Sequence, residues 1–600
     1  MGGDSPFFPS GLPGIPPIPG IPPFSPIPDI PPIDAPPPLA VTKQIKDPKA
    51  KPFFLPPNNA SNLLEFRGAV RDTLTIKPII DGKQIFTELE KAIDKAESSV
   101  LIAFWLFNLD MPLVTDSSRT WLDLLVDVVS RKVKVRLFMN DFDPVLGWAD
   151  FHTNAWERYF RLLDTFKSVS SDLFQVVCSR HETEIADSIM DLAIKNLYDN
   201  HADEINKADE SYRKNKYSNS PGLWDKLDYD ATTTKLSPKV KGKSYPAWPG
   251  SHHQKIVIVD GKYAYTGGLN VAPVYLDSQK HNKPIEQLPW HDAFVKVEGS
   301  FPVRDFIRNF ISIWNKERVN SENFLKNAYK ASNVKLPVVI GTTTDLTEKI
   351  IPAQLTSTAT PKIPGQVHRT ISKKGTDPKG IAVTIRQDIL EGTIQAISNA
   401  QEYIYIENQY FREKTIGDAI IKRQKDVPDL KTIIVVPSII EEFLDPSKVD
   451  DISNYGAALQ YEIFDEMISK LGKNLGLYCM IRHDDKLIYV HSKLMIIDDA
   501  FVSLGSANSN PRSYKMDTEL NYAWYDTKTA EKLRLDLWEE ILGNPSGMNK
   551  WQATDYITKW NAIANKNKSA RPKSRKGFVM PFDNVVKGKK NLFADLSPFT

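Results

Sequence analysis

The spacing of apolar residues follows a repeating pattern in the first part of the chain. In residues 77–108, apolar side chains recur every three or four positions through QIFTELEKAIDKA and then run together in SVLIAFWLF. This pattern predicts an amphipathic helix followed by a buried strand. Residues 119–144 again read as a helix and then a strand. Such alternation is typical of βαβ units, so we expect an α/β fold with a mostly parallel central sheet.

The same pattern starts again near residue 380. Residues 383–411 predict a helix that leads into a strand, and residues 426–438 predict the next strand. The intervening segment 336–380 is rich in Thr, Pro and Gly, which is typical of a linker. We therefore expect two halves of similar architecture, 58–335 and 381–600, of which the second includes a C-terminal extension.

Two other segments depart from this pattern. Residues 181–245 are charged, rich in Tyr and Asn and weakly periodic, so we expect a helical insertion with a long loop. Residues 1–57 form a proline-rich extended segment, because residues 1–40 alone hold 15 of the 43 prolines. This segment is either a semi-rigid spacer or, since Ile, Phe and Leu are interleaved with the prolines, a docking segment.

Composition limits the classes of function. The chain has 600 residues, of which 41% are hydrophobic and 25% charged, as in a globular protein with a large core. Its 76 Lys and Arg nearly balance 74 Asp and Glu, which disfavours extensive nonspecific binding of nucleic acid. The only cysteines, Cys178 and Cys479, exclude a disulfide framework and a cysteine-built zinc site. No run of ~20 apolar residues could span a bilayer, and the first basic residue is Lys43, so we expect no secretory signal.

One polar pattern occurs twice. Each copy begins with His; Lys follows after two positions, Asp after seven, two small residues after fourteen and fifteen, and Asn after seventeen. The first copy comprises His253, Lys255, Asp260, Gly267, Gly268 and Asn270, and the second comprises His491, Lys493, Asp498, Gly505, Ser506 and Asn508. Two matched copies in one chain indicate a duplicated functional unit.

The spacing of this pattern has a physical basis. Residues i and i+2 of a strand share a face, so the His and Lys of each copy are expected to point together. Asp260 and Gly261 have the chemistry of a tight turn, which would bring the small residues and Asn back beside the His. Small residues let the backbone approach an anion closely. Each copy therefore predicts a phosphate-sized pocket.

These HxKxxxxD motifs, followed by GGxN and GSxN, resemble the phospholipase D superfamily, in which two such motifs form one active site. Further resemblance lies in PWHDAFVKVEG at 289–299, IENQYF at 406–411 and MDTELN at 516–521. The markers extend over about residues 76–545. The resemblance implies two pseudo-symmetric α-β-α halves that share one active site at their interface.

The resemblance also implies the roles of the repeated residues. His253 would attack the phosphorus atom of a phosphodiester and form a phosphohistidine, while His491 would act as general acid and base. From the residues alone, the symmetry of the motifs leaves this assignment open. Lys255 and Lys493 would bind phosphate through their positive charge. Because His and Lys supply this chemistry, we expect neither a metal nor another cofactor.

The remaining residues of the two motifs have less certain roles by their chemistry. Asp260 and Asp498 either tune the catalytic site directly or only support their turns, and the sequence favours neither alternative. The expected substrate contacts are Asn270, Asn508, Gly268 and Ser506.

Each imidazole also needs a carboxylate on its second ring nitrogen, which fixes the tautomer and stabilises the charged form. Glu519, 28 residues after His491, occupies the place of the family's orienting acid. Asp292, 39 residues after His253, is the matching candidate in the first half. The spacing leaves open which carboxylate serves which histidine.

The favoured function is a phospholipase D that hydrolyses glycerophospholipids to phosphatidic acid and a free head-group alcohol. We expect a monomer, because both half-sites lie in one chain. We expect the substrate to be a phospholipid membrane, because IENQYF and WHD resemble the lipid-acting branch. One alternative is a nucleic-acid phosphodiesterase of the same superfamily, although the near-neutral charge leads us to expect no nucleic-acid partner. The other is a binding or scaffold protein, which the intact His, Lys and Asn of both motifs disfavour.

The chain further resembles bacterial antibacterial phospholipase effectors, which are delivered by contact-dependent secretion such as type VI secretion. The basis is a lipase body combined with an apolar proline-rich head and no expected signal peptide. Such a toxin would wait in the bacterial cytoplasm, act in the periplasm of a target cell and have secretion-apparatus and immunity-protein partners. A housekeeping cytosolic lipase is the equal alternative.

Overall fold

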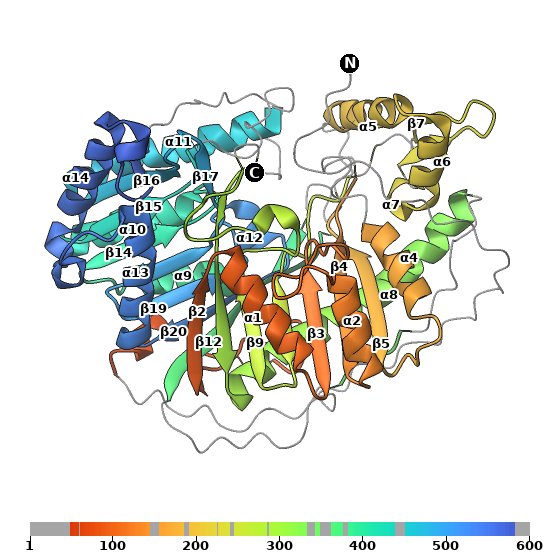
Figure 1. Ribbon diagram of the computed structural model, residues 1–600, viewed down its shortest axis with the longest axis horizontal. Coiled ribbons are helices and arrows are strands. Elements are labelled where there is room, and N and C mark those ends of the chain that lie inside the picture. Colours follow the sequence, from red (N-terminus) through yellow and green to blue (C-terminus); the bar gives the residue numbers. More distant parts are fainter. Residues whose placement is uncertain are drawn as a thin grey trace.

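Strands with apolar residues on both faces build two large sheets in the computed structural model (Figure 1). The structure describes residues 48–582 except positions 59, 225 and 246 and segments 145–154, 185–190, 240–244, 285–286, 333–342, 348–361, 376–381 and 439–450. Residues 1–47 of the proline-rich segment, and much of the expected linker, therefore lie outside the described residues. Within the described part, no helix is both long enough and apolar enough to cross a membrane.

The first sheet has seven strands in the order β2-β11-β9-β8-β3-β4-β5. The strands are β2 (Thr75–Ile80), β3 (Ser99–Phe104), β4 (Lys134–Asp141), β5 (Phe174–Arg180), β8 (Ile256–Val259), β9 (Tyr263–Gly267) and β11 (Ala293–Glu298). The helices of this half include α1 (Gly82–Asp94), α2 (Trp121–Ser130), α4 (Ala155–Thr165) and α8 (Ser300–Ser332).

The second sheet repeats this arrangement strand for strand, as β12-β20-β19-β18-β14-β15-β16. These strands are β12 (Ile363–Lys374), β14 (Tyr403–Glu407), β15 (Lys431–Val435), β16 (Leu475–Ile481), β18 (Leu494–Ile497), β19 (Phe501–Gly505) and β20 (Glu519–Tyr525). Further strands extend it, namely β1 (Arg71–Thr73), β10 (Trp290–His291), β13 (Ala382–Gln387), β17 (Leu487–Val490) and β21 (Val579–Pro581). The matching strand order confirms an α/β fold with two pseudo-symmetric halves.

The pairing within both sheets is mixed, which corrects the expectation of mostly parallel sheets. In the seven-stranded order, only β3–β4 and β4–β5 are parallel, as are β14–β15 and β15–β16 in the second half. The duplicated hairpins β8–β9 and β18–β19 are antiparallel. The cause is the tight turn after each HxK segment, which returns the chain directly and leaves no room for a crossover helix.

The helices and sheets pack in layers around one shared core. In β3, Val100 and Ile102 face the outer cluster with α1, α2 and α4, while Leu101 and Ala103 face a central cluster. The central cluster joins the inner faces of both sheets with α8, α13 (Thr527–Leu542) and α14 (Tyr556–Ser569). Helices α9 (Asp388–Ile397), α10 (Lys414–Asp426) and α11 (Asp451–Leu471) belong to the second half, and side chains of all three cover the opposite face of its sheet. Burial of the central cluster, which contains side chains from both sheets, therefore holds the two halves together.

The charged region 181–245 forms a separate group of elements at the upper right of Figure 1. It contains α5 (Asp191–Asn206), α6 (Glu210–Ser218), α7 (Pro221–Trp224), β6 (Leu227–Tyr229) and β7 (Leu236–Pro238). The apolar side chains of Leu223 and Trp224 are fully buried in the outer cluster of the first half. This packing anchors the insertion to that half.

Candidate active site

The two HxK segments lie directly before the central hairpins, because β8 begins at Ile256 and β18 begins at Leu494. In each segment, the Lys side chain folds back on the backbone of the His. Lys255 Nζ donates to the carbonyl oxygen of His253 at 2.8 Å, and Lys493 Nζ makes the same contact with His491. Each imidazole is thereby accompanied by an ammonium group.

Each histidine is paired with a carboxylate from the other half of the chain. His253 Nδ1 lies 2.8 Å from Glu519 Oε1, at the start of β20. His491 Nδ1 lies 2.8 Å from Asp292 Oδ2, between β10 and β11. The sequence left open which carboxylate pairs with which histidine. In the structure, each histidine pairs with the carboxylate of the other half. Both imidazoles are therefore oriented only when the halves are packed together.

Backbone hydrogen bonds reinforce the same crossing. The amide of His253 donates to the carbonyl oxygen of Thr518 at 2.9 Å, and the amide of His491 donates to that of His291 at 2.7 Å. Thr518 and His291 directly precede the paired carboxylates. Strand β10 also pairs in parallel with β17, which leads into His491. Backbone pairing therefore fixes each histidine beside its carboxylate.

The small residues after each hairpin support the carboxylates, which corrects their expected role as substrate contacts. Ser506 donates its hydroxyl to Glu519, and Ser513 donates to the same carboxylate at 2.7 Å. At Gly268, an added Cβ would lie 2.4 Å from Asp292 Oδ1 and 2.6 Å from the carbonyl oxygen of His491. Glycine is required there because the His491–Asp292 pair occupies that space.

The two asparagines of the motifs differ in their surroundings. Asn270 accepts from the amide of Leu106 at 3.2 Å and donates to the hydroxyl of Tyr275 at 2.9 Å. Its phosphate contact stays a prediction. Asn508 is 8% exposed, and its Oδ1 has no hydrogen-bond partner. Asn508 therefore stays a predicted substrate contact.

Asp260 and Asp498 lie at the opposite ends of β8 and β18 from the histidines, which corrects their assignment as catalytic. Both have a positive φ, 53° and 54°, in the turns of the hairpins. Asp260 accepts hydrogen bonds from the amides of Ser98 and Ser99, at 2.7 Å and 3.0 Å. Asp498 accepts from the three consecutive amides 401–403. Both residues support turns against the start of a neighbouring strand.

Burial and positive charge set the protonation of the two imidazoles. Burial lowers the pKa of His253 well below its usual 6.5, and Lys255 lowers it further. Burial likewise lowers the pKa of His491, which Lys493, Lys255 and His253 depress further. Each imidazole thus senses the charges of the opposite motif, as expected if both face one substrate phosphate.

The orienting carboxylates shift in the opposite direction. Burial raises the pKa of Glu519 to about 8 and that of Asp292 to about 7. Each imidazole–carboxylate pair therefore retains a shared proton into the neutral range. Such a buried pair can hold the proton that moves during acid–base chemistry.

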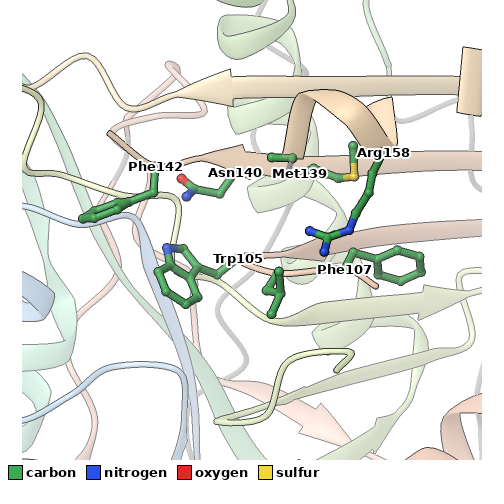
Figure 2. Close-up of a pocket in the computed structure, with 8 residues that line it drawn as sticks. Trp105, Phe107, Met139, Asn140, Phe142 and Arg158 are labelled. Atoms are coloured by element: carbon green, nitrogen blue, oxygen red, sulfur yellow. The ribbon is translucent and has the colours of Figure 1, made fainter. Parts of the chain in front are cut away.

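A small pocket with both apolar and polar lining residues lies beside the first motif (Figure 2). The ring of Trp105 contacts the His253 ring edge-on, with centroids 5.7 Å apart, and Trp105 is also part of the pocket wall. The other lining residues are Leu106, Phe107, Met139, Asn140, Phe142, Ala155 and Arg158. The site thus joins the histidine centre to a small recess of mixed polarity.

Sequence reasoning missed several groups around the imidazoles. Trp290 and Tyr275 pack on the His491 ring, with centroid separations of 5.0 Å and 5.2 Å. Gln409 Oε1 accepts from Lys493 Nζ at 3.2 Å. Trp290 and Gln409 fall within the recognised markers and could have been found there. Trp105 and Tyr275 stand in apolar stretches and carried no comparable signal.

Comparisons with known proteins agree with this geometry. A family model described as "Phospholipase D" matches residues 276–436, and one described as "Cardiolipin synthase, PLD-like domain" matches residues 393–540. Phospholipase D1 of Homo sapiens is 29% identical over 285 residues, which are 40% of this chain and 24% of that protein. Cardiolipin synthase 1 of Bacillus cereus is 25% identical over 295 residues, which are 48% of this chain and 46% of that protein. The chain thus spans less than half the length of these two relatives.

Among solved structures, the phosphatidylserine synthase of Haemophilus influenzae aligns with a TM-score of 0.47 and 12% identity, covering 84% of this chain and 97% of that chain. The duplicated sheets and paired HxK segments define a protein with two related domains. Together with the family matches, they show that the chain is a member of the phospholipase D superfamily with two phospholipase D-like domains.

The position of Asp260 leads to a stability prediction. We expect Asp260→Ala to lower the free energy of unfolding by about 1–3 kcal/mol, because it leaves amides at the start of β3 without an acceptor. Urea titration would measure this loss, and turnover of a chromogenic phosphodiester by the folded variant should stay unchanged. A variant of unchanged stability that lost turnover would restore the catalytic role.

The Glu519–His253 pair leads to a prediction about pH. Unfolded histidine loses its proton near pH 6.5, whereas the folded pair keeps one until Glu519 titrates at about 8. The folded state therefore binds more protons within this interval, so the contribution of the pair to stability falls as the pH rises from about 6.5 to about 8.

We expect Glu519→Gln to flatten this part of the stability curve, since glutamine cannot titrate. The measurement is urea unfolding at several pH values, with Glu531→Gln as a control because Glu531 is an exposed carboxylate. Parallel curves for wild type and Glu519→Gln would contradict the shared proton.

Proposed function

We propose that this protein cleaves a phospholipid phosphodiester through a phosphohistidine, either by hydrolysis or by transfer to an alcohol. The observation that carries the proposal is the crossed pairing of His253 with Glu519 and of His491 with Asp292, with a lysine bound to each histidine carbonyl. A general acid and a nucleophile, both buried near positive charge, suit attack on a phosphodiester.

His253 is proposed as the nucleophile. Its side chain is 12% exposed, compared with 4% for His491, and it contacts Trp105 in the wall of the pocket. Once the pair has released its shared proton, the Nε2 lone pair would attack phosphorus and form a P–N bond while the bond to the leaving oxygen breaks. The carboxylate of Glu519 would hold Nδ1–H and stabilise the positive charge that develops on the ring.

His491 is proposed as the general acid. It would give the Nε2 proton to the leaving alcohol and then take a proton from water or an acceptor alcohol, which displaces His253 and regenerates both rings. Lys255 and Lys493 lower the pKa of His491 in the free site. A bound phosphodiester carries negative charge, which would offset these lysines and favour the protonated ring.

A lipid substrate is favoured over nucleic acid. The recess beside His253 combines the aromatic side chains of Trp105 and Phe142 with the cation of Arg158, so it offers both an apolar and a positively charged contact to a phospholipid. The formal charge of +2 provides little general attraction for a polyanion. The names of the relatives include both phospholipases D and cardiolipin synthases, so hydrolysis to phosphatidic acid and phosphatidyl transfer are both candidate outcomes.

Delivery of the protein to a neighbouring cell stays a prediction, as do its secretion-apparatus and immunity-protein partners. It depends on the proline-rich head, of which residues 1–47 lie outside the described part of the chain.

The decisive experiment compares substrates and histidine variants. Full-length protein would be incubated with mixed phosphatidylcholine, phosphatidylethanolamine and phosphatidylglycerol vesicles, and separately with plasmid and single-stranded DNA. We expect head-group release that falls at least ~10³-fold in both His253→Ala and His491→Ala, because the two imidazoles act as a unit. His483→Ala is the matched control, since His483 is exposed.

Addition of glycerol or phosphatidylglycerol would separate transfer from hydrolysis by the lipid product formed. DNA cleavage that depends on His253, without release of lipid head groups, would replace the lipid proposal with the nuclease alternative. Lipid turnover that survives both alanine variants would refute the mechanism.

A further inference from the structure

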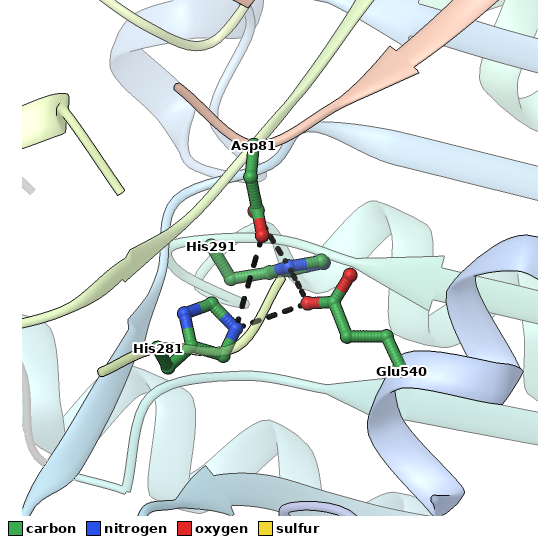
Figure 3. A group of neighbouring side chains, drawn as sticks. All are labelled: Asp81, His281, His291 and Glu540. Carbon is green, nitrogen blue, oxygen red and sulfur yellow. Dashed lines mark hydrogen bonds and ion pairs between the residues drawn. The ribbon is translucent and has the colours of Figure 1, made fainter. Parts of the chain in front are cut away.

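A second cluster of chemically active side chains lies behind the His491–Asp292 pair (Figure 3). It consists of Asp81 at the start of α1, His281 in the loop before β10, His291 in β10 and Glu540 in α13. One potential ligand atom from each residue lies within 4.8 Å of the others, and all four residues are buried. In Figure 3, the two carboxylates and the inner edges of both rings converge on one small region.

The outer nitrogen of each ring is held by a second carboxylate. His281 Nδ1 pairs with Asp277 Oδ2 at 2.9 Å, and His291 Nε2 pairs with Glu407 Oε2 at 3.1 Å. These contacts leave His281 Nε2 and His291 Nδ1 directed inward. Histidines that bind metal ions show this arrangement, in which a carboxylate accepts from the outer N–H and presents the inner nitrogen to the ion.

Hydrogen bonds alone leave this cluster incompletely satisfied. His291 Nδ1 lies 2.8 Å from Glu540 Oε1 and 3.1 Å from Asp81 Oδ1, yet forms a well-directed hydrogen bond with neither. Asp81 Oδ2 and Glu540 Oε2 are also buried without a donor. Asp81 and His291 are completely excluded from solvent at their side chains. Unsatisfied polar atoms at such depth are costly unless another partner completes them.

We infer that these four residues bind a divalent transition-metal ion, with Zn²⁺ as the best match. Two imidazole nitrogens favour a transition metal over Mg²⁺ or Ca²⁺, and four protein ligands suit the tetrahedral coordination of Zn²⁺. A network of two imidazolium ions with the same carboxylates would carry the same total charge as two neutral imidazoles with one divalent ion. His281 Nε2 also lies 3.0 Å from Glu540 Oε1, so the observation that favours the ion is the set of unsatisfied atoms, His291 Nδ1, Asp81 Oδ2 and Glu540 Oε2.

The location gives the ion a structural role next to the proposed catalytic site. Asp81 exchanges hydrogen bonds with Asp292: its amide donates to the Asp292 carbonyl oxygen at 2.8 Å, and its Oδ1 accepts from the Asp292 amide at 3.2 Å. Glu540 comes from the second half of the chain. An ion here would link α13 to the segment between β10 and β11 that contains Asp292. It would position His491 through its carboxylate and would not touch the substrate.

The test is direct measurement of metal binding by the full-length protein. Protein stripped with a chelator and dialysed would be titrated with Zn²⁺, and bound metal would be counted by mass spectrometry. We expect about one Zn²⁺ per chain and a higher thermal unfolding midpoint after loading. Glu540→Gln should lose this ion, whereas Glu539→Gln should keep it, because Glu539 is the exposed neighbour on the same helix.

A second variant covers the case in which Glu540→Gln fails to fold. Asp277→Asn leaves the four ligands intact and removes the charge of the acceptor that His281 shares with the amide of Trp290, so we expect a 10–100-fold weaker affinity for Zn²⁺. Folded, stripped wild-type protein that binds no Zn²⁺, or that binds it equally in all variants, would overturn the inference. These readouts do not require activity, so they stand or fall independently of the proposed phosphodiesterase.

Discussion

The crossed pairing of each imidazole with the other half's carboxylate is the interaction on which the site depends. His253 and His491 are too deeply buried to carry charge without a partner, and each partner arrives from the opposite sheet. The central cluster of α8, α13, α14 and the inner sheet faces fixes the distance between the halves. Packing of the central cluster, far from the histidines, thereby keeps both imidazole rings in a fixed orientation. Acid–base catalysis requires such preorganisation.

The duplicated motif was predictable because it is local. A His, a Lys two residues later and a turn seven residues later describe one hairpin, so spacing along the chain is sufficient to find them. Asp292 and Glu519 were also identified as candidates from their positions in the markers. The histidine that each carboxylate pairs with was not predictable. This pairing depends on how the two hairpins pack together, and the residue spacing within either half does not reveal it.

Other errors have equally physical causes. The sequence left the role of Asp260 open between the turn and the catalytic site, and the four-residue strand β8 places it at the far end of the hairpin from His253. The expectation of mostly parallel sheets was wrong because apolar periodicity reports burial and carries no information about which way the neighbouring strand runs, whereas the two hairpins were expected from their turn residues. No short motif could have predicted the second cluster, because its members come from distant segments. Two of them, Asp81 and Glu540, are more than 450 residues apart, and the others are His281 and His291.

The two halves also differ in ways that matter for chemistry. Two equivalent histidines cannot serve as nucleophile and acid together unless their surroundings make them unequal. Glu519 accepts hydrogen bonds from two serine hydroxyls. The carboxylate of Asp292 instead accepts from the amide of Ala293, and the backbone amide of Asp292 donates to Asp81. Burial raises the pKa of Glu519 to about 8, and the two hydroxyl donors offset part of this effect, so they would help the carboxylate to ionise once the proposed nucleophilic ring becomes charged. The more enclosed His491 instead lies under Trp290 and Tyr275, where a proton is shielded from water until a leaving oxygen arrives. Under the proposed mechanism, the symmetry of the fold would supply two rings to one phosphate, and the asymmetry of the residues that support them would divide the roles of nucleophile and acid.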